Sequence, residues 1–173
     1  MNNTVLVAYS SKYGATREIA EEITETLRKK EIQADLRSAD SVEDIQGYKA
    51  VILGSAIYVG QWPKSAVSFL KKNQENLMGV PVWLFSSGPS GEGDPLQLVD
   101  GVRFPASLKP LIDSIHPLDI TVFHGDINLN KINAMEKWAI KNIVKKPFGD
   151  YRNWDSINRW TLSVVERMKF AGI

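Results

Sequence analysis

The fold of this chain is decided close to its beginning, where residues 4–20 read TVLVAYSSKYGATREIA. The apolar run from Thr4 to Tyr9 is typical of a strand that is covered on both faces of a sheet. After a turn of small residues, apolar side chains recur every four positions and predict an amphipathic helix from Ala15 to Lys30. A buried strand, a short turn and a helix in this order indicate an α/β fold.

The rest of the chain continues this alternation of short apolar runs and segments of helical period. The other strands are predicted at Ile32 to Ser38, Tyr48 to Leu53, Gly79 to Phe85 and Asp119 to His124. The other helices are predicted at Pro63 to Leu77, Ala106 to Ser114, Ile132 to Lys145 and Ser156 to Lys169. The pattern predicts a single domain over residues 1–173, with a three-layer, doubly wound sheet of five parallel strands in the order 2-1-3-4-5.

This strand order places a ligand crevice where the first and third strands diverge at their carboxyl ends. The loops that leave the sheet at that edge are therefore the places to look for ligand chemistry. The three candidate loops are Ser10 to Thr16, Ser55 to Trp62 and Ser86 to Gly93.

The charges of the chain are balanced, with 21 Lys and Arg against 20 Asp and Glu and a formal net charge of +1. Tight binding to nucleic acid or to an anionic lipid surface usually needs a basic excess on one face, so nucleic acid is not an expected partner. The chain has no cysteine, which excludes disulfides, thiolate metal sites and a cysteine nucleophile. Redox chemistry would therefore need an organic cofactor or a histidine-ligated metal.

Neither a membrane span nor a metal centre is predicted. The longest apolar runs reach only about a third of the roughly 20 residues that cross a bilayer. The N-terminus lacks the features of a signal peptide, and a cytoplasmic protein without an integral membrane segment is expected. His116 and His124 flank the fifth predicted strand, roughly 26 Å apart in extended backbone, and should not share a metal. Both are expected to be surface or capping residues.

One other α/β function is excluded and another is disfavoured. A receiver domain needs carboxylates after the first strand and an aspartate at the end of the third, where this chain has Ser10-Ser11 and Gly54-Ser55. A serine hydrolase of this class needs a Gly-x-Ser-x-Gly elbow, and the sequence has none.

The first loop joins the first strand to the start of the first helix, where free backbone N–H groups and the positive end of the helix dipole converge. A phosphate fits there, with hydroxyl donors, a lysine and a glycine that lets the backbone approach the oxygens. An ordinary helix cap with a serine at its start is equally compatible with the spacing. The residues concerned are Ser11, Lys12, Tyr13, Gly14, Ala15 and Thr16.

The same loop resembles the signature of the flavodoxin family, in which an aromatic residue ends the strand before a spaced pattern of Ser or Thr, a small residue, Thr and Ala. The residues in register with it are Tyr9, Ser11, Gly14, Thr16 and Ala20. The resemblance implies a flavodoxin-like fold over nearly the whole chain. It also implies non-covalently bound FMN, with the phosphate held by the loop from Ser11 to Thr16.

In that family the second and third loops lie beside the flavin ring. The resemblance implies further cofactor-binding residues, which are Ser55, Ala56, Ile57, Tyr58, Val59 and Gly60 in the second loop and Ser86, Ser87, Gly88 and Pro89 in the third. Tyr58 and Trp62 are candidates for stacking on the ring. Trp62 fits equally well as a core residue that covers the second helix.

Two stretches are similar to one branch of the family, the flavodoxin-fold protoporphyrinogen oxidases that pass electrons to menaquinone. These stretches are Thr16 to Ala20 and Gly54 to Gly60. The branch also tends to carry basic, tryptophan-containing C-terminal segments, and the residues of this chain that resemble them are Lys145-Lys146, Trp154-Asp155 and Trp160.

The resemblance leaves two function classes open. The first is an electron carrier, in which FMN exchanges electrons with redox partner proteins and no residue is catalytic. The alternative is an FMN-dependent oxidoreductase of the protoporphyrinogen oxidase type, with a porphyrin or quinone substrate. The nearly neutral charge of this chain argues against a carrier, because carrier flavodoxins are markedly acidic. The lack of a predicted acid or base over the flavin site argues against an enzyme. The carrier is therefore the preferred interpretation, and enzyme activity stays open.

Overall fold

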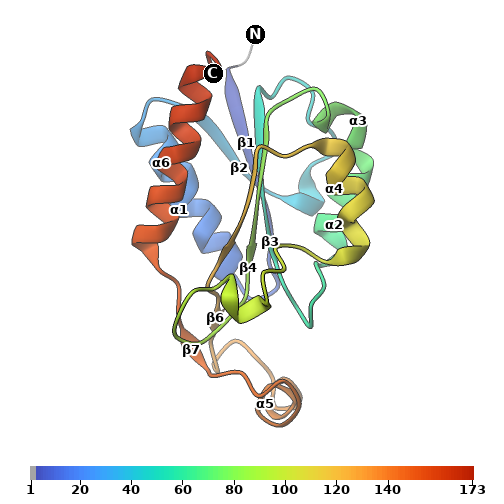
Figure 1. The fold of residues 1–173 in the computed structure, drawn as a ribbon, viewed down its shortest axis with the longest axis vertical. Helices are drawn as coiled ribbons and strands as arrows, with labels where there is room; N and C mark the ends of the chain where they lie inside the picture. Colours follow the sequence, from blue (N-terminus) through green and yellow to red (C-terminus); the bar gives the residue numbers. More distant parts are fainter. Residues whose placement is uncertain (1–2) are drawn as a thin grey trace.

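The computed structural model describes residues 3–173 and contains a five-stranded parallel sheet with helices on both faces (Figure 1). The strands, in their order across the sheet, are β2 (Gln33–Ser38), β1 (Thr4–Ser10), β3 (Ala50–Ala56), β4 (Val82–Ser87) and β5 (Asp119–Phe123). The predicted order 2-1-3-4-5 and the three-layer α/β architecture are confirmed.

Two helical layers cover the sheet. One face carries α1 (Ala15–Lys29) and α6 (Trp154–Phe170), and the other carries α2 (Lys64–Lys72), α3 (Gln74–Leu77) and α4 (Lys109–Ile115) (Figure 1). Three short 3₁₀ turns complete the connections, at η1 (Ala39–Ser41), η2 (Gln97–Val99) and η3 (Ala106–Leu108). Within residues 3–173, no helix combines the length and the apolar character needed to cross a bilayer.

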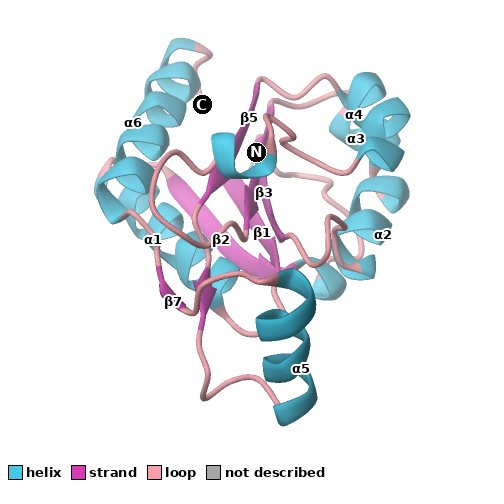
Figure 2. Ribbon diagram, turned by 60° about the horizontal axis from the view of Figure 1, so that its bottom comes forward, coloured by secondary structure: helices cyan, strands magenta, loops and turns pink. Residues whose placement is uncertain are grey.

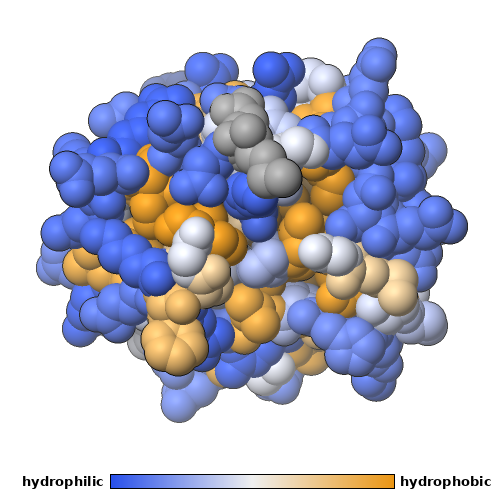
Figure 3. All heavy atoms as spheres, turned by 90° about the horizontal axis from the view of Figure 1, so that it is seen from above, coloured by the Kyte–Doolittle hydropathy of each residue, from blue (hydrophilic) through white to orange (hydrophobic). Residues whose placement is uncertain are grey.

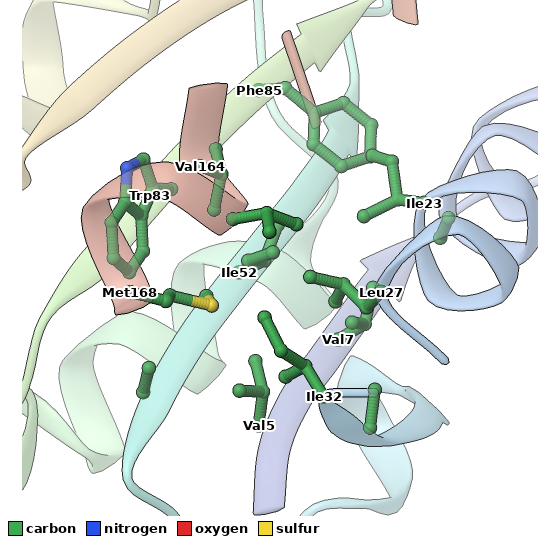
Figure 4. Close-up of a cluster of buried hydrophobic side chains, with 14 of the residues drawn as sticks. Val5, Val7, Ile23, Leu27, Ile32, Ile52, Trp83, Phe85, Val164 and Met168 are labelled. Carbon is green, nitrogen blue, oxygen red and sulfur yellow. The ribbon is translucent and has the colours of Figure 1, made fainter. Parts of the chain in front are cut away.

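The core lies in two clusters because successive side chains of a strand point to opposite faces of the sheet. Val5 and Val7 of β1 face α1 and α6, whereas Leu6 of β1 faces α2. Figure 4 shows the first cluster, in which Leu27 of α1 and Met168 of α6 lie over the sheet. All five side chains are fully buried, and burying such a side chain stabilises the fold by about 1.5–3 kcal/mol.

The strand register aligns the loops at the carboxyl edge of the sheet. Ser10 of β1 lies opposite Ser55 of β3, and Ser55 lies opposite Ser86 of β4. The strands therefore extend further than the apolar runs predicted, because these small polar residues are the last members of the hydrogen-bonded ladder. Ser55 and Ser86 were expected in loops and are instead strand residues.

The helix predicted from Pro63 to Leu77 is divided into α2 and α3 at Asn73. The side-chain amide of Asn73 donates a hydrogen bond of 3.0 Å to the Phe69 carbonyl, which satisfies one of the carbonyls at the end of α2. The split leaves the apolar face of both pieces against the sheet, because Leu70 and Leu77 are fully buried.

A separate segment follows β5 and projects beyond the carboxyl edge of the sheet (Figures 1 and 2). It consists of β6 (Asp126–Ile127), α5 (Ala134–Ala139), a π-helical turn (Ile140–Val144) and β7 (Gly149–Asp150), with β6 and β7 paired antiparallel. We call residues 126–152 the distal segment. Its helix was predicted from Ile132 to Lys145, while the turn expected at 125–128 contains a short strand.

The amino end of β1 and the C-terminus lie at the opposite end of the molecule from α5 (Figure 1). Figure 3 shows that end, where hydrophilic side chains form most of the margin and apolar atoms are visible toward the middle. The candidate loops therefore share one end of the molecule with the distal segment, and the amino end of β1 and the C-terminus occupy the other.

Candidate functional site

The three candidate loops meet in one pocket of about 150 Å³ at the carboxyl edge of the sheet. Nine of the predicted site residues line it, which are Tyr13, Ala15, Thr16, Ala56, Ile57, Tyr58, Val59, Ser87 and Gly88. The pocket lies at the place where β1 and β3 diverge, as the strand order predicts.

The first loop turns into α1 through Gly14, whose φ of +95° is in the left-handed region that favours glycine. The Gly14 N–H donates to Ser11 Oγ at 2.9 Å. The N–H groups of Ala15 and Thr16 begin the first turn of α1, so they have no carbonyl four residues earlier within the helix. This arrangement aims backbone donors and the positive end of the helix dipole at the pocket.

Hydroxyl groups join the first loop to its neighbours. Thr16 Oγ1 and Ser87 Oγ lie 2.7 Å apart and are buried, while Ser10 Oγ and Ser65 Oγ lie 2.5 Å apart. A hydroxyl can donate one hydrogen bond and accept others. Thr16 and Ser87 therefore keep hydrogen-bonding capacity at a point where both line the pocket.

Tyr58 connects the second loop to the first. Its hydroxyl accepts a hydrogen bond of 3.0 Å from the Lys12 backbone N–H, and its ring meets the ring of Tyr13 edge-on at 5.9 Å between centroids. Burial raises the pKa of the Tyr58 hydroxyl. The tyrosine therefore lies at the pocket wall as a neutral phenol, in contact with the loop proposed to hold a phosphate.

The second loop contains a tight turn at Val59 and Gly60. Tyr58 and Gln61 exchange two backbone hydrogen bonds of 2.9 and 3.0 Å, and both central residues have positive φ, +50° for Val59 and +72° for Gly60. A positive φ is strained for a β-branched residue. Val59 is also 89% exposed, so the turn presents an apolar side chain to solvent beside the pocket mouth.

Trp62 is a core residue and not a wall of the pocket. Its ring is buried against α2, and its indole N–H donates to Ser86 Oγ at 3.0 Å. Ser86 Oγ in turn donates to the Arg103 carbonyl at 2.7 Å. The side chain of Ser55 is fully buried and bonds to the Ala56 carbonyl at 3.1 Å.

The end of the third loop is fixed by backbone contacts. The Pro89 carbonyl accepts a hydrogen bond of 2.9 Å from the Gly125 N–H, and it lies 3.2 Å from His124 Nδ1. His124 Nε2 lies 2.9 Å from the Gly93 carbonyl. His124 was expected to be a surface or capping residue; the surface alternative is wrong, because His124 is 8% exposed, and its ring nitrogens contact two carbonyls of this loop.

The distal segment supplies a part of the pocket that the sequence analysis did not predict. Its contributions are Asp126, Ile127, Asn128, Ile132, Ile140 and Lys146, together with the preceding Gly125. The one local signal in this region is a capping box, in which Asn133 and Glu136 bond to each other's backbone N–H at the start of α5. A capping box predicts where a helix begins, not where it docks.

Glu136 also joins the distal segment to the first loop. Its carboxylate lies 2.6 Å from Lys12 Nζ and accepts a hydrogen bond from the Tyr13 hydroxyl. The hydrogen bond from Lys12, and after it the one from Tyr13, lowers the pKa of Glu136 to about 2. Lys12 Nζ lies 4.7 Å from the centre of the Tyr13 ring, so a cation, an acid and two phenols meet at the pocket rim.

A second group of charges surrounds Arg152, whose side chain is only 6% exposed. Its guanidinium lies 2.5 Å from Glu18, 2.7 Å from Asp150 and 3.9 Å from Asp126. Hydrogen bonds from Arg152 lower the pKa values of Glu18 and Asp150, whereas burial and nearby Asp150 raise that of Asp126. Arg152 thus fastens the distal segment to the first turn of α1.

Lys131 places another cation near the first loop. Its Nζ lies 3.5 Å from Glu18 and 3.7 Å from the position that a Cβ on Gly14 would take. A cavity of about 580 Å³ adjoins this region and shares Asp126, Ile127 and Asn128 with the first pocket. The site therefore combines backbone donors, hydroxyls and lysines with apolar walls, which suits an anionic ligand that carries a flat apolar group.

Comparison with known proteins agrees with this geometry. A family model described as a flavodoxin domain matches residues 6–152. Among curated proteins, the chain is similar to protoporphyrinogen IX dehydrogenase [quinone] of Escherichia coli K12. The two are 31% identical over 180 residues, which cover 92% of this chain and 93% of that protein.

Solved flavodoxins share the fold. Oxidised flavodoxin 2 from Bacillus cereus has a TM-score of 0.60 and 18% identity, covering 95% of this chain and 99% of that one. A flavodoxin from the domain Archaea has a TM-score of 0.59 and 14% identity, covering 96% of this chain and 99% of that one. At these identities the likeness concerns the fold alone.

Proposed function

Because this chain belongs to the flavodoxin family, we propose that it binds FMN non-covalently in the pocket at the carboxyl edge of the sheet and transfers electrons to and from redox partner proteins. Proteins of this family generally bind FMN. When bound, FMN supplies the one- and two-electron chemistry that the side chains of this protein lack.

The observation that carries the proposal is the convergence of the three loops around the start of α1. The phosphate is assigned to the first loop, from Ser11 to Thr16, where backbone N–H groups, hydroxyls and Lys12 can surround an anion. Lys131 adds charge from the distal segment. These groups bind and orient the cofactor.

The ring is assigned to the apolar part of the pocket. Ala56 and Ile57 lie on one side, and Ile127, Ile132 and Ile140 come from the distal segment. Such side chains exclude water from a flat aromatic group. The exposed Val59 turn beside them leaves an edge of the site accessible to a protein partner.

The first pocket by itself is too small for a whole mononucleotide, so either the adjoining cavity takes part of the ligand or the distal segment opens. A pocket of about 150 Å³ is smaller than the roughly 300 Å³ at which ligand pockets usually begin. The contacts of Glu136 with Lys12 and Tyr13 hold α5 against the first loop. Because Lys12 is exposed and Glu136 and Tyr13 are only partly buried, we expect these contacts to be weak enough to open.

A second candidate function is an FMN-dependent oxidoreductase that acts on a porphyrin and passes electrons to a quinone. It is supported by the 31% identity to a protoporphyrinogen IX dehydrogenase [quinone] over nearly the full length of both chains. That identity is the specific observation in its favour, because the apolar side chains of the distal segment are already assigned to the flavin ring.

FMN titration tests the main proposal. We expect the purified protein to bind FMN at about one to one. Hydrogen bonds to a charged group contribute about 1.5–3 kcal/mol, so riboflavin, which lacks the phosphate, should bind at least about tenfold more weakly. Equal affinity for FMN and riboflavin, or no binding of either, would contradict the assignment of the first loop.

A pair of turnover assays then separates the two functions. The carrier should reduce a redox protein such as cytochrome c when supplied with reductant and FMN, and it should not oxidise a reduced porphyrin. The oxidoreductase should oxidise protoporphyrinogen with a quinone as acceptor. Porphyrin turnover that is lost when FMN is removed would establish the second function.

A further inference from the structure

The distal segment exposes apolar side chains that the fold does not bury. Met135 is 79% exposed, Trp138 60% and Ile143 68%, and all three lie within nine residues of one another. Figure 2 shows their helix standing apart from the layers that cover the sheet. Large apolar side chains that gather on a projecting element mark an interaction surface.

Lysines surround these apolar side chains. Lys137, Lys141 and Lys145 are exposed along the same helical turns. The acid of this helix, Glu136, is already paired with Lys12 and Tyr13. The surface is therefore locally basic, although the whole chain has a net charge of only +1.

We propose that this α5 surface, formed by Met135, Trp138, Ile143, Lys137, Lys141 and Lys145, binds the surface of an anionic phospholipid bilayer. Interfacial helices combine apolar and tryptophan side chains, which enter the headgroup region, with lysines that meet the lipid phosphates. The charge of the lysines is complementary to anionic headgroups, and the tryptophan suits the boundary between water and hydrocarbon.

The binding would orient the molecule. In Figure 1, α5 lies beyond the carboxyl edge of the sheet and opposite the C-terminus. Ile140, which lies between Trp138 and Lys141 in the sequence, lines the pocket. A membrane contact through α5 therefore brings the pocket close to the lipid surface and turns the C-terminus away from it.

Vesicle sedimentation tests the proposal with the full-length protein. We expect it to sediment with vesicles of phosphatidylglycerol and phosphatidylcholine, and not with phosphatidylcholine alone. Each lysine near an anionic surface contributes about fivefold in affinity. The triple substitution K137Q/K141Q/K145Q should therefore lower the partition coefficient by about a hundredfold, and salt at about 1 M, where the Debye length is about 3 Å, should release the wild-type protein.

The apolar part of the surface is tested separately. Trp138→Ser should lower the partition coefficient by about tenfold, the factor that corresponds to about 60 Å² of ring leaving water at about 25 cal/mol per Å². A blue shift of tryptophan emission on adding the anionic vesicles should be present in the wild type and strongly reduced in this variant.

Matched control variants separate the α5 surface from general stickiness. Phe170→Ser removes an apolar side chain that is 95% exposed at the other end of the molecule. K71Q/K72Q removes two exposed lysines from the end of α2. Both controls should bind vesicles as the wild type does, and circular dichroism should show that all variants are folded.

Three results would overturn the proposal. The first is failure of the wild-type protein to bind the anionic vesicles. The second is equal loss of binding in the α5 variants and the controls. The third is a dimer in sedimentation velocity that Trp138→Ser dissociates, together with no vesicle binding, because the α5 surface would then be occupied by a second copy of the chain.

Discussion

Replacing Gly14 by valine tests whether the first loop holds the cofactor. Gly14 has φ +95°, and an added Cβ would meet only the flexible end of Lys131 at 3.7 Å. The substitution therefore introduces backbone strain and not a steric clash. A residue other than glycine in a left-handed conformation costs about 1–2 kcal/mol.

The test compares how much of this strain lowers the free energy of unfolding and how much lowers the affinity for FMN. Without ligand, only two hydrogen bonds hold Gly14, one to Ser11 Oγ and one from the Glu18 N–H to the Gly14 carbonyl. Because the loop can relax around so few contacts, the free energy of unfolding should fall by less than about 0.5 kcal/mol. FMN binding must restore the left-handed turn. The dissociation constant should then rise about 5- to 30-fold, the factor that corresponds to about 1–2 kcal/mol.

The assay combines FMN titration with urea unfolding of the ligand-free protein. Gly47→Val is the matched control, because Gly47 has φ +89° and no atom within 4 Å of its added Cβ but precedes the amino end of β3, at the opposite edge of the sheet from the candidate loops. It should leave the FMN affinity unchanged. Gly14→Asn should lie between wild type and valine, since asparagine tolerates this conformation. An unchanged FMN affinity in Gly14→Val would refute the reasoning and leave the loop as an ordinary helix cap.

Three further changes probe the pocket and its surroundings. Arg152→Met should lower the free energy of unfolding, measured in urea titrations, by about 1–3 kcal/mol. This loss is smaller than the roughly 3–5 kcal/mol lost when one partner of a fully buried ion pair is removed, because Glu18 is partly exposed. Trp62→Phe should lower the free energy of unfolding by about 1 kcal/mol, because the hydrogen bond to Ser86 is lost. The affinity for FMN should stay within about twofold of the wild type. A large loss of affinity would instead place the Trp62 ring at the cofactor. The pKa of Glu136 is lowered from 4.5 to about 2, so its stabilising contacts are complete above pH 4.5 and are lost as the pH falls toward 2. Limited proteolysis of the distal segment should increase over that range more steeply in the wild type than in Glu136→Gln, which keeps only the acid-sensitive contacts of Arg152 with Glu18 and Asp150.

The sheet could be predicted because its signals are local. The apolar run of β1 and the four-residue period of α1 are visible in seventeen consecutive residues, and right-handed crossovers then leave few strand orders. The ends of β3 and β4 were less predictable. Their last residues are small and polar, so the apolar pattern stops before the ladder does.

The site could be predicted only as far as the strand order determines it. The order brings the three loops together, and nine of their residues line one pocket. Side-chain direction is set by tertiary contacts that the sequence does not reveal. Tyr58 was the preferred stacking candidate in the sequence, and Trp62 fitted a core position equally well; only the structure shows that Trp62 turns into the core toward Ser86 and that Tyr58 turns toward Lys12.

The position of the distal segment could not be predicted from local pattern, because long-range ion pairs hold it. Glu136 meets Lys12, and Arg152 meets Glu18, over more than 120 residues of sequence. The Lys12–Glu136 pair is partly exposed, and pairs of that kind contribute about 0–1 kcal/mol, in contrast to about 1.5–3 kcal/mol for each large apolar side chain buried in the sheet, so the buried Arg152 is the main ionic contact of the segment. The segment that completes the pocket is therefore the part of the site most easily repositioned by a few substitutions. Proteins that share this sheet can for that reason differ in what their pockets accept without any change in the core.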